Sequence, residues 1–439
     1  FLAQFDRNPS LLPPRAQPEG SLVGLLKNPL FGLPKDTNFA VSPYKSKLTL
    51  DYVTPPTLAI GVDRYGTYGA GGISAFWSDM LGQHTVITTA ITGPSLIDTS
   101  GAVAYLNSKN RFNWGAALQR IVYPYPYYSY YYDETTYGEP AYVEIEDIYR
   151  IINYDLSAFA SYPLTSAQRV ELTGGFRHIG FNETLYTRVY GMYSGAEIYY
   201  SKTHPDTMPG LNYGYVTGAM YYDTGIFGAT SPIIGQSYGL GVSQSVGNVM
   251  FTTVSADFRK YVIPVKPFTL AFRAMHLGRY GRDSEDDRFY PLYLAYWDLV
   301  RGYESFNSDN TFDYYRLFGS KIIVANVELR FPLLRLLGIG KGYFGAWPFE
   351  VYGFYDAGLA WADHTGGWWG PGADLGGGYT DNDVKAWFLK GGQRKPVTST
   401  GVGIRTNFFG MLVMGLNYVY PIERPERGWH LQFYISPGF

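Results

Sequence analysis

The tripeptide Arg301-Gly302-Tyr303 is where the sequence most clearly suggests chemistry, because Glu328 and Asp356 follow it in segments with strand-like alternation. A guanidinium presents a planar fork of donors that binds carboxylates through paired hydrogen bonds, each strengthened by charge. The glycine permits a tight backbone, and the tyrosine can fill the contact. We expect the long loop that carries this tripeptide to fold inward and to dock its arginine on the two carboxylates.

The other residues that could do chemistry are isolated or unsuited to it. The acidic run 283–287, DSEDD, offers oxygen ligands of the kind that calcium takes, but we interpret it as part of a solvated external loop. His178, His204 and His276 lack the spacing of zinc ligands. No serine lies in a nucleophile-elbow pattern, and no glycine run opens a helix after a strand. We therefore expect no catalytic residue, no metal and no cofactor, and a protein that is not an enzyme.

The composition favours a chain that meets two boundaries between water and an apolar phase. Of the 439 residues, 18% are aromatic and only 16% are charged. Amphipathic rings are enriched where a protein crosses such boundaries. The net charge of −2 gives no electrostatic basis for binding nucleic acid. The absence of cysteine excludes a disulfide framework and thiolate metal sites.

The chain from Lys47 onward alternates between apolar and polar residues in segments separated by Gly, Pro, Asn and Asp. This period of two predicts about sixteen antiparallel strands, an even number as in bacterial barrels. No apolar run approaches the roughly 18 residues of a spanning helix. Residues 1–46, rich in proline, are expected to form an arm or linker ahead of a barrel at 47–439.

The connections between these strands alternate in length. The tight turns fall at 81–83, 110–112, 164–168 and 265–267. The long links fall at 125–145, 183–211, 281–319 and 362–397. Counting strands in order places all four long links on one rim, as in a membrane barrel with short periplasmic turns and long external loops. The sequence therefore predicts an all-β transmembrane barrel whose sixth external loop folds inward.

Segment 321–332 shows which face meets which phase. Ile323, Ala325, Val327, Leu329 and Phe331 share one face, and the other carries Asn326, Glu328 and Arg330. An arginine toward lipid at mid-depth would cost a few kcal/mol, roughly 2–4. We therefore expect the charged face to line a wet lumen.

Four motifs in order resemble one family, the BamA/TamA-type outer-membrane assembly and translocation barrels, also called bacterial surface antigen domains. They are VRGY at 300–303, VELRFPL at 327–333, FYDAG at 354–358 and the final LQFYISPGF, ending at Phe439. The resemblance implies that Arg301 docks on the inner wall, with Asp356 as its partner and Glu328 nearby. It also implies a terminal signal strand, Leu431, Phe433 and Phe439, that the assembly machinery reads.

The resemblance further implies a place and a role. The expected location is the bacterial outer membrane, where the barrel would contact lipid and outer-membrane or periplasmic protein partners. The expected role is assembly or translocation of outer-membrane proteins, with a weak seam between the first and last strands. Family members of this kind carry periplasmic repeat domains, which residues 1–46 are too short to hold. Because the chain begins with FLAQFDRNPS, without a signal peptide, we expect it to be processed or truncated.

Two alternatives stay open at this point. The barrel could serve as a membrane anchor or a partner-binding barrel for an upstream or associated module, without transport. A soluble β sandwich could also present alternating faces, although it has no reason to sort its loops by length onto one rim.

Overall fold

The structure, a computed structural model, describes residues 43–55, 57–63, 66–93, 95–134, 137–304, 314–333, 348–362, 396–408 and 412–437. The chain divides into two units, Phe1–Ser46 and Lys47–Phe439. Residues 1–42 lie outside the described residues, so the arm assigned to 1–46 stays a prediction. Within the described residues, no helix is both long and apolar enough to cross a membrane.

The second unit is built of antiparallel strands. In chain order they are β1 (Thr49–Val53), β2 (Thr57–Asp63), β3 (Gly66–Ser78), β4 (His84–Thr92), β5 (Ser100–Asn107), β6 (Asn113–Asp133), β7 (Ala141–Pro163), β8 (Gln168–Gly191), β9 (Glu197–Thr203), β10 (Leu211–Asp223), β11 (Ile226–Phe227), β12 (Pro232–Gly247), β13 (Phe251–Val265), β14 (Phe268–Tyr280), β15 (Leu292–Tyr293), β16 (Phe318–Gly319), β17 (Lys321–Pro332), β18 (Phe349–Trp361), β19 (Val397–Phe408), β20 (Leu412–Pro421) and β21 (His430–Pro437). Short 3-10 turns lie at Leu96–Asp98, Tyr314–Leu317 and Pro425–Arg427.

Nineteen of these strands form one sheet in which each wall strand pairs with the next along the chain. Both β1 and β2 pair with β3 and so continue one another, while β9 and β11 are short additions beside β8 and β12. Setting these aside leaves sixteen wall strands, which confirms the predicted all-β antiparallel architecture. Among the described strands, β21 pairs with β20 alone, and β1 and β2 pair with β3 alone.

The connections are sorted between two rims, as the sequence predicts. The links β6–β7, β8–β10, β14–β17 and β18–β19 share one rim, which we call the loop rim. The turns β3–β4, β5–β6, β7–β8 and β13–β14 share the other, which we call the turn rim. In outer-membrane barrels the loop rim is external and the turn rim is periplasmic.

Strand β17 shows the expected alternation. Ile323, Val327 and Leu329 are exposed, whereas Glu328 and Arg330 are buried. In β21, Leu431 is 64% and Phe433 58% exposed, while Gln432 and Tyr434 between and after them are buried. On both strands the charged and amide side chains therefore point inward, and the exposed outward positions are apolar. Phe439 lies outside the described residues.

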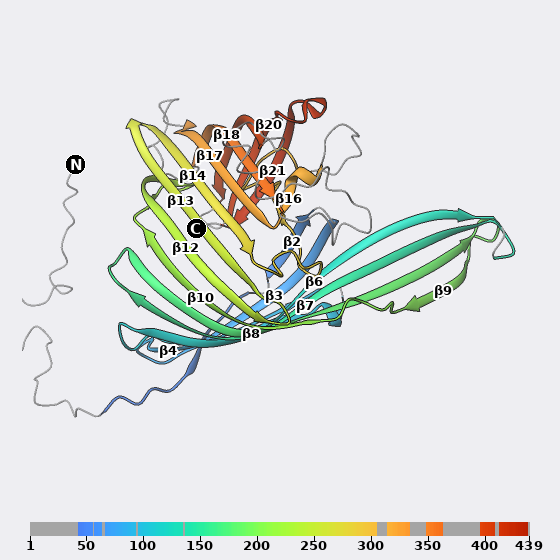
Figure 1. The fold of residues 1–439 in the computed structure, drawn as a ribbon, viewed down its shortest axis with the longest axis horizontal. Helices are drawn as coiled ribbons and strands as arrows, with labels where there is room; N and C mark the ends of the chain where they lie inside the picture. Colours follow the sequence, from blue (N-terminus) through green and yellow to red (C-terminus); the bar gives the residue numbers. More distant parts are fainter. Residues whose placement is uncertain are drawn as a thin grey trace, which may run out of the picture. The chain divides into compact units, whose positions relative to one another are not determined.

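For two of the four long links the prediction of a loop is wrong, because most of their residues form strands. The link expected at 125–145 is the end of β6 and the start of β7, and that at 183–211 contains the end of β8 and all of β9. Figure 1 shows β6, β7 and β8 running side by side well beyond β10, with β9 beside their far end. A spanning strand needs only about 9–11 residues, and these strands have 21, 23 and 24. Roughly half of each therefore stands outside the membrane.

The prolines of β6 explain why its strand continues where a break seemed natural. The amide of Val122 points away from β7, since it donates to Ser100 Oγ at 3.0 Å on the β5 side. Residues at every second position share this direction, so Pro124 and Pro126 lack a donor only on the open edge. Proline is tolerated at such edge positions, and the tyrosines around it have high β propensity.

The outward face of β17 gives a first test. Val327→Arg should lower the free energy of unfolding in lipid vesicles by about 2–4 kcal/mol, because its side chain faces lipid near mid-depth. Tyr127→Arg is the matched control, since Tyr127 is 68% exposed on the projecting part of β6; its effect should stay within about 0.5 kcal/mol. Urea titration measures both, and equal losses would contradict the assigned membrane region.

Candidate functional site

The described parts of the β14–β17 loop, 281–304 and 314–320, fold against the barrel wall through an apolar core. The loop strands β15 and β16 pair with each other. Around them a buried cluster joins loop residues Leu294, Val300 and Leu317 to wall residues Ile322 and Val324. Burial of these aliphatic side chains helps to hold the loop against the wall.

Two wall side chains then fix the loop backbone just ahead of the tripeptide. Arg273 of β14 donates from Nη1 to the carbonyl oxygen of Asp298 at 2.8 Å. Asn326 of β17 donates from Nδ2 to the carbonyl oxygen of Leu299 at 2.7 Å. Loop carbonyls that would otherwise be buried without partners are thus satisfied by the wall, and the next residues are held at a defined depth.

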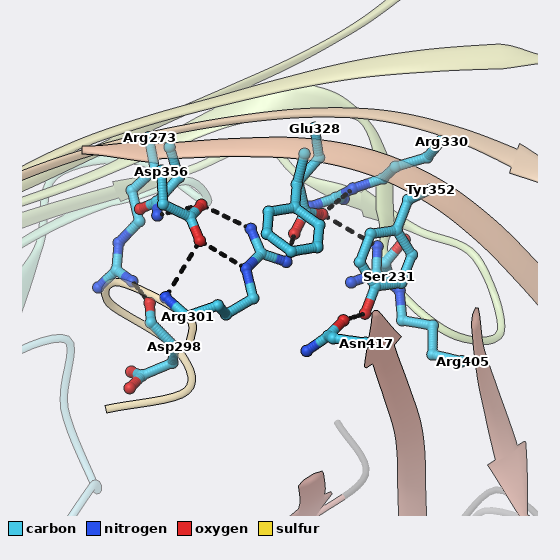
Figure 2. A network of polar contacts seen from close by, with 12 residues as sticks. Ser231, Arg273, Asp298, Arg301, Glu328, Arg330, Tyr352, Asp356, Arg405 and Asn417 are labelled. Atoms are coloured by element: carbon cyan, nitrogen blue, oxygen red, sulfur yellow. Dashed lines mark hydrogen bonds and ion pairs between the residues drawn. The ribbon is translucent and has the colours of Figure 1, made fainter. Parts of the chain in front are cut away.

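The structure brings Arg301 together with Asp356 and Glu328 (Figure 2). Its Nε and Nη2 donate to the two carboxylate oxygens of Asp356 at 2.6 and 2.7 Å, and its Nη1 donates to Glu328 Oε1 at 2.7 Å. The backbone amide of Arg301 also donates to Asp356, at 3.3 Å. The guanidinium therefore binds one carboxylate in a fork and a second with its remaining arm.

The contact is dry. Arg301 is 6% and Asp356 0% exposed, and the guanidinium carbon lies 3.6 Å from the ring centroid of Phe354. Burial by itself lowers the pKa of Arg301, but Asp356 and Glu328 outweigh it and raise the pKa above its usual range. Arg301 therefore stays charged at any physiological pH, and the pair is one whose disruption would leave buried charges unpaired.

Gly302 lets the loop turn directly after the arginine. Its φ of 90° lies where residues with a side chain are strained. A Cβ on Gly302 would also lie 2.8 Å from Val419 Cγ2 of β20. Backbone conformation and space thus both require glycine here.

Tyr303 is fully buried and ties the loop to a second part of the wall. Its hydroxyl lies 2.7 Å from both the carbonyl oxygen of Thr398 and Glu423 Oε2, and it accepts from the Glu423 amide at 3.3 Å. Burial, followed by the hydrogen bond and charge of Glu423, raises the pKa of Tyr303. The hydroxyl stays protonated and can act as donor to the β19 side of the lumen.

The dock is part of a larger charge network, and the sequence alone identifies only some of its members. Arg330 donates from Nε to Glu328 Oε2 at 2.8 Å, and Arg405 of β19 lies 3.4 Å from the same oxygen. Arg405 also donates from Nε to Glu350 Oε1 at 3.1 Å, its direct partner across β18 and β19. The inward phase of 401–405 could have identified Arg405, whereas Arg273 carries no signal beyond its alternation.

The charged groups of the dock pair with one another. Each charged group at the dock is engaged by an opposite charge or a hydrogen-bond donor, as Figure 2 shows. Of the acidic run 283–287, Asp286 pairs with Arg288 at 2.6 Å and Asp283 accepts from the Met250 amide at 2.7 Å. Among the described residues, no group of three or more acidic or histidine side chains is placed to hold a metal ion.

One protein family and two solved structures are similar to this chain. The Omp85 superfamily domain matches residues 127–439. The crystal structure of BamA from Haemophilus ducreyi lacking POTRA domains 1–3 is 13% identical, with a TM-score of 0.52 over 90% of this chain and 75% of that one. CdiB from Acinetobacter baumannii is 11% identical, with a TM-score of 0.43 over 90% of this chain and 66% of that one. No curated protein matches the sequence.

The dock should dominate the stability of the barrel. Arg301→Ala should lower the free energy of unfolding by about 3–5 kcal/mol, because it leaves the buried carboxylate of Asp356 without its arginine. Arg301→Lys keeps the charge but not the forked hydrogen bonds, so its loss of unfolding free energy should lie between that of wild type and that of the alanine variant. Arg169→Ala, which breaks a pair with a 53% exposed arginine side chain, should cost less than about 1 kcal/mol. Urea titration in vesicles compares them, and similar losses for both alanine variants would contradict the role of the dock.

The tyrosine should contribute separately. Tyr303→Phe removes only the hydroxyl that meets Glu423 and Thr398, so it should cost about 1.5–3 kcal/mol, the range for a hydrogen bond to a charged group. Tyr355→Phe is the control, since Tyr355 is 47% exposed on the outer face of β18. The same titration should show almost no effect there; an equally small effect at Tyr303 would remove it from the site.

Proposed function

The chain belongs to the Omp85 superfamily and is a bacterial outer-membrane barrel for protein assembly or translocation, and on this premise we propose that polypeptide segments leave it through the seam between its first and last strands. Proteins of this superfamily typically assemble or transport rather than catalyse. In this proposal the docked loop keeps the wall beside the seam in position while the seam opens.

The observation that carries the proposal is a cavity at the edge of the last strand. Gln432 and Phe433 both line it, together with loop and wall aromatics that include Tyr125, Tyr296 and Trp297. Gln432 and Phe433 are neighbours on β21, so the cavity lies directly against the last strand. Since β21 pairs with β20 alone among the described strands, this edge supports a lateral path between lumen and membrane.

The loop is tied to the seam strand β21 as well as to β17 and β18. Glu304 accepts from Gln432 Nε2 at 2.8 Å, and Arg427 donates to the carbonyl oxygen of Gly302 at 3.1 Å. Trp297 stacks on Tyr434 with ring centroids 4.7 Å apart. A shift of the docked loop would therefore move β21, which gives the Arg301 contact a way to influence the seam.

A second candidate role, binding of an outer-membrane or external protein partner, is favoured by the projecting strands. Beyond Ile121, β6 pairs with β7 alone among the described strands. Its projecting tyrosines are at least 47% exposed: Tyr127, Tyr128, Tyr130, Tyr131 and Tyr132. Tyrosine is enriched in protein interfaces, and an open strand edge accepts a further strand.

Assembly through the seam is tested by site-specific crosslinking. The photoreactive amino acid benzoylphenylalanine replaces Phe433 at the cavity or, as control, Phe258, which is 44% exposed on the outer face of β13. Proteoliposomes receive a urea-denatured outer-membrane barrel client, and its folded form is followed by heat-modifiability on gels. We expect folding several-fold faster than in empty liposomes, with the client crosslinked at Phe433 and not at Phe258.

The outcomes separate the two candidates. Accelerated folding with equal crosslinking at Phe258 would keep assembly but remove the seam as its path. No acceleration, together with a stable protein partner that copurifies from membranes, would replace assembly with the binding role.

A further inference from the structure

A second element enters the lumen, from the rim opposite the docked loop. The connection between β10 and β12 is a hairpin at the turn rim that includes β11. Residues 224–227 are largely exposed, but Thr230 and Ser231 are only 3% exposed each. We call residues 228–231 the turn tip; it is closed by a hydrogen bond from the Gly228 amide to the Ser231 carbonyl at 2.8 Å. A turn at the rim of a barrel normally lies in water. Two buried hydroxyls in this turn therefore indicate that it folds inward.

The backbone of this hairpin is bent to do so. The register of β11 against β12 shifts between Ile226 and Phe227, which marks a bulge. Gly235 has a φ of 115°, and a Cβ there would lie 2.2 Å from the carbonyl oxygen of Thr224. Bulges and left-handed glycines redirect a strand end. The bulge and Gly235 both lie at the base of the hairpin, where they can direct its tip away from the wall and into the lumen.

The turn tip binds strands that are not its neighbours. Thr230 Oγ1 and Ser231 Oγ donate to Glu350 Oε2 of β18 at 2.6 and 2.7 Å. Asn407 of β19 donates from Nδ2 to the carbonyl oxygen of Ala229 at 2.6 Å. In the sheet, β13, β14 and β17 lie between β12 and β18. Four strand spacings amount to about 19 Å along the wall, so the turn tip reaches β18 by leaving the wall and crossing the lumen.

The same charges connect the turn tip to the docked loop. Arg330 donates from Nη1 to the carbonyl oxygen of Pro232, directly after the turn tip, and from Nε to Glu328. Arg405 joins Glu350 to Glu328, and Glu328 binds Arg301. A continuous path of ion pairs and hydrogen bonds therefore runs from the external loop to the periplasmic turn. Figure 2 shows Ser231 and Arg301 within this one network.

We propose that the turn tip is a second closing element of the barrel, which blocks the periplasmic end of the lumen while it is latched to Glu350 and Asn407. Its release is coupled to the loop dock through Glu328. The closure concerns ions and small solutes in the lumen, so it stands independently of assembly through the seam.

The chemistry of the two closures indicates which one moves first. If the loop left, Arg301 and Asp356 would each lose the partner of a buried charge. If the turn tip left, Glu350 would lose two neutral hydroxyl donors but would keep Arg405. Losing a neutral donor from a carboxylate that stays ion-paired costs far less than unpairing a buried charge. The turn tip is therefore the element that opens while the loop stays docked.

Single-channel conductance of the purified barrel in planar bilayers tests the closure. Thr230→Ala/Ser231→Ala removes both latch hydroxyls and should raise the frequency of open events roughly tenfold or more over wild type. The control is Thr217→Ala/Ser243→Ala, which removes a comparable hydroxyl pair (2.7 Å) between β10 and β12 within the wall. It should behave as wild type. If the latch variant fails to fold by heat-modifiability, Asn407→Ala tests the same latch from β19.

Two results would overturn the proposal. Equal open frequencies in wild type, latch variant and control would show that the turn tip does not close the lumen. For the coupling, Arg301→Lys is combined with the latch variant. If the two closures are linked, the combined increase falls short of the product of the separate increases; a full product would mean that they act independently.

Discussion

The buried contact of Arg301 with Asp356 and Glu328 is the interaction on which the interior of this barrel depends. It joins a loop that would otherwise be solvated to two wall strands, and its three charges are removed from water together. Such a group is costly to break because the members left behind stay buried. The neighbouring residues keep the guanidinium in place. Gly302 allows the turn directly after it, and Tyr303 anchors the loop to a second part of the wall.

The network that extends from this contact gives the lumen two closures of different strength. On the loop rim, the closure is an ion pair with an apolar cluster behind it. On the turn rim it is a pair of hydroxyls on Glu350, which has a permanent partner in Arg405. Both meet at Glu328, which receives arginines from the loop, from its own strand and from β19. The seam at β21 lies outside this network but is tied to the loop through Glu304 and Trp297.

Much of this architecture can be predicted from the sequence. Alternation in 321–332 places Glu328 inward, and an arginine in the long loop before it is a suitable partner for inward carboxylates. The extent of β6 to β8 was not predictable in this way, because Pro124 and Pro126 read as a break until their direction toward an open edge is known. The contact of Thr230 with Glu350 spans 120 residues and depends on the bend at Gly235, and alternation alone carries no information about either.

A double-mutant cycle between Arg301 and Asp356, measured by urea unfolding in lipid vesicles, tests the central contact most directly. Arg301→Ala, Asp356→Ala and the double variant give the coupling free energy, to which the two side chains contribute only through their interaction. The dock predicts a coupling of at least about 1.5 kcal/mol, as for close charge pairs that are removed from water. Effects that add to within about 0.5 kcal/mol would mean that the loop is held by its apolar cluster alone.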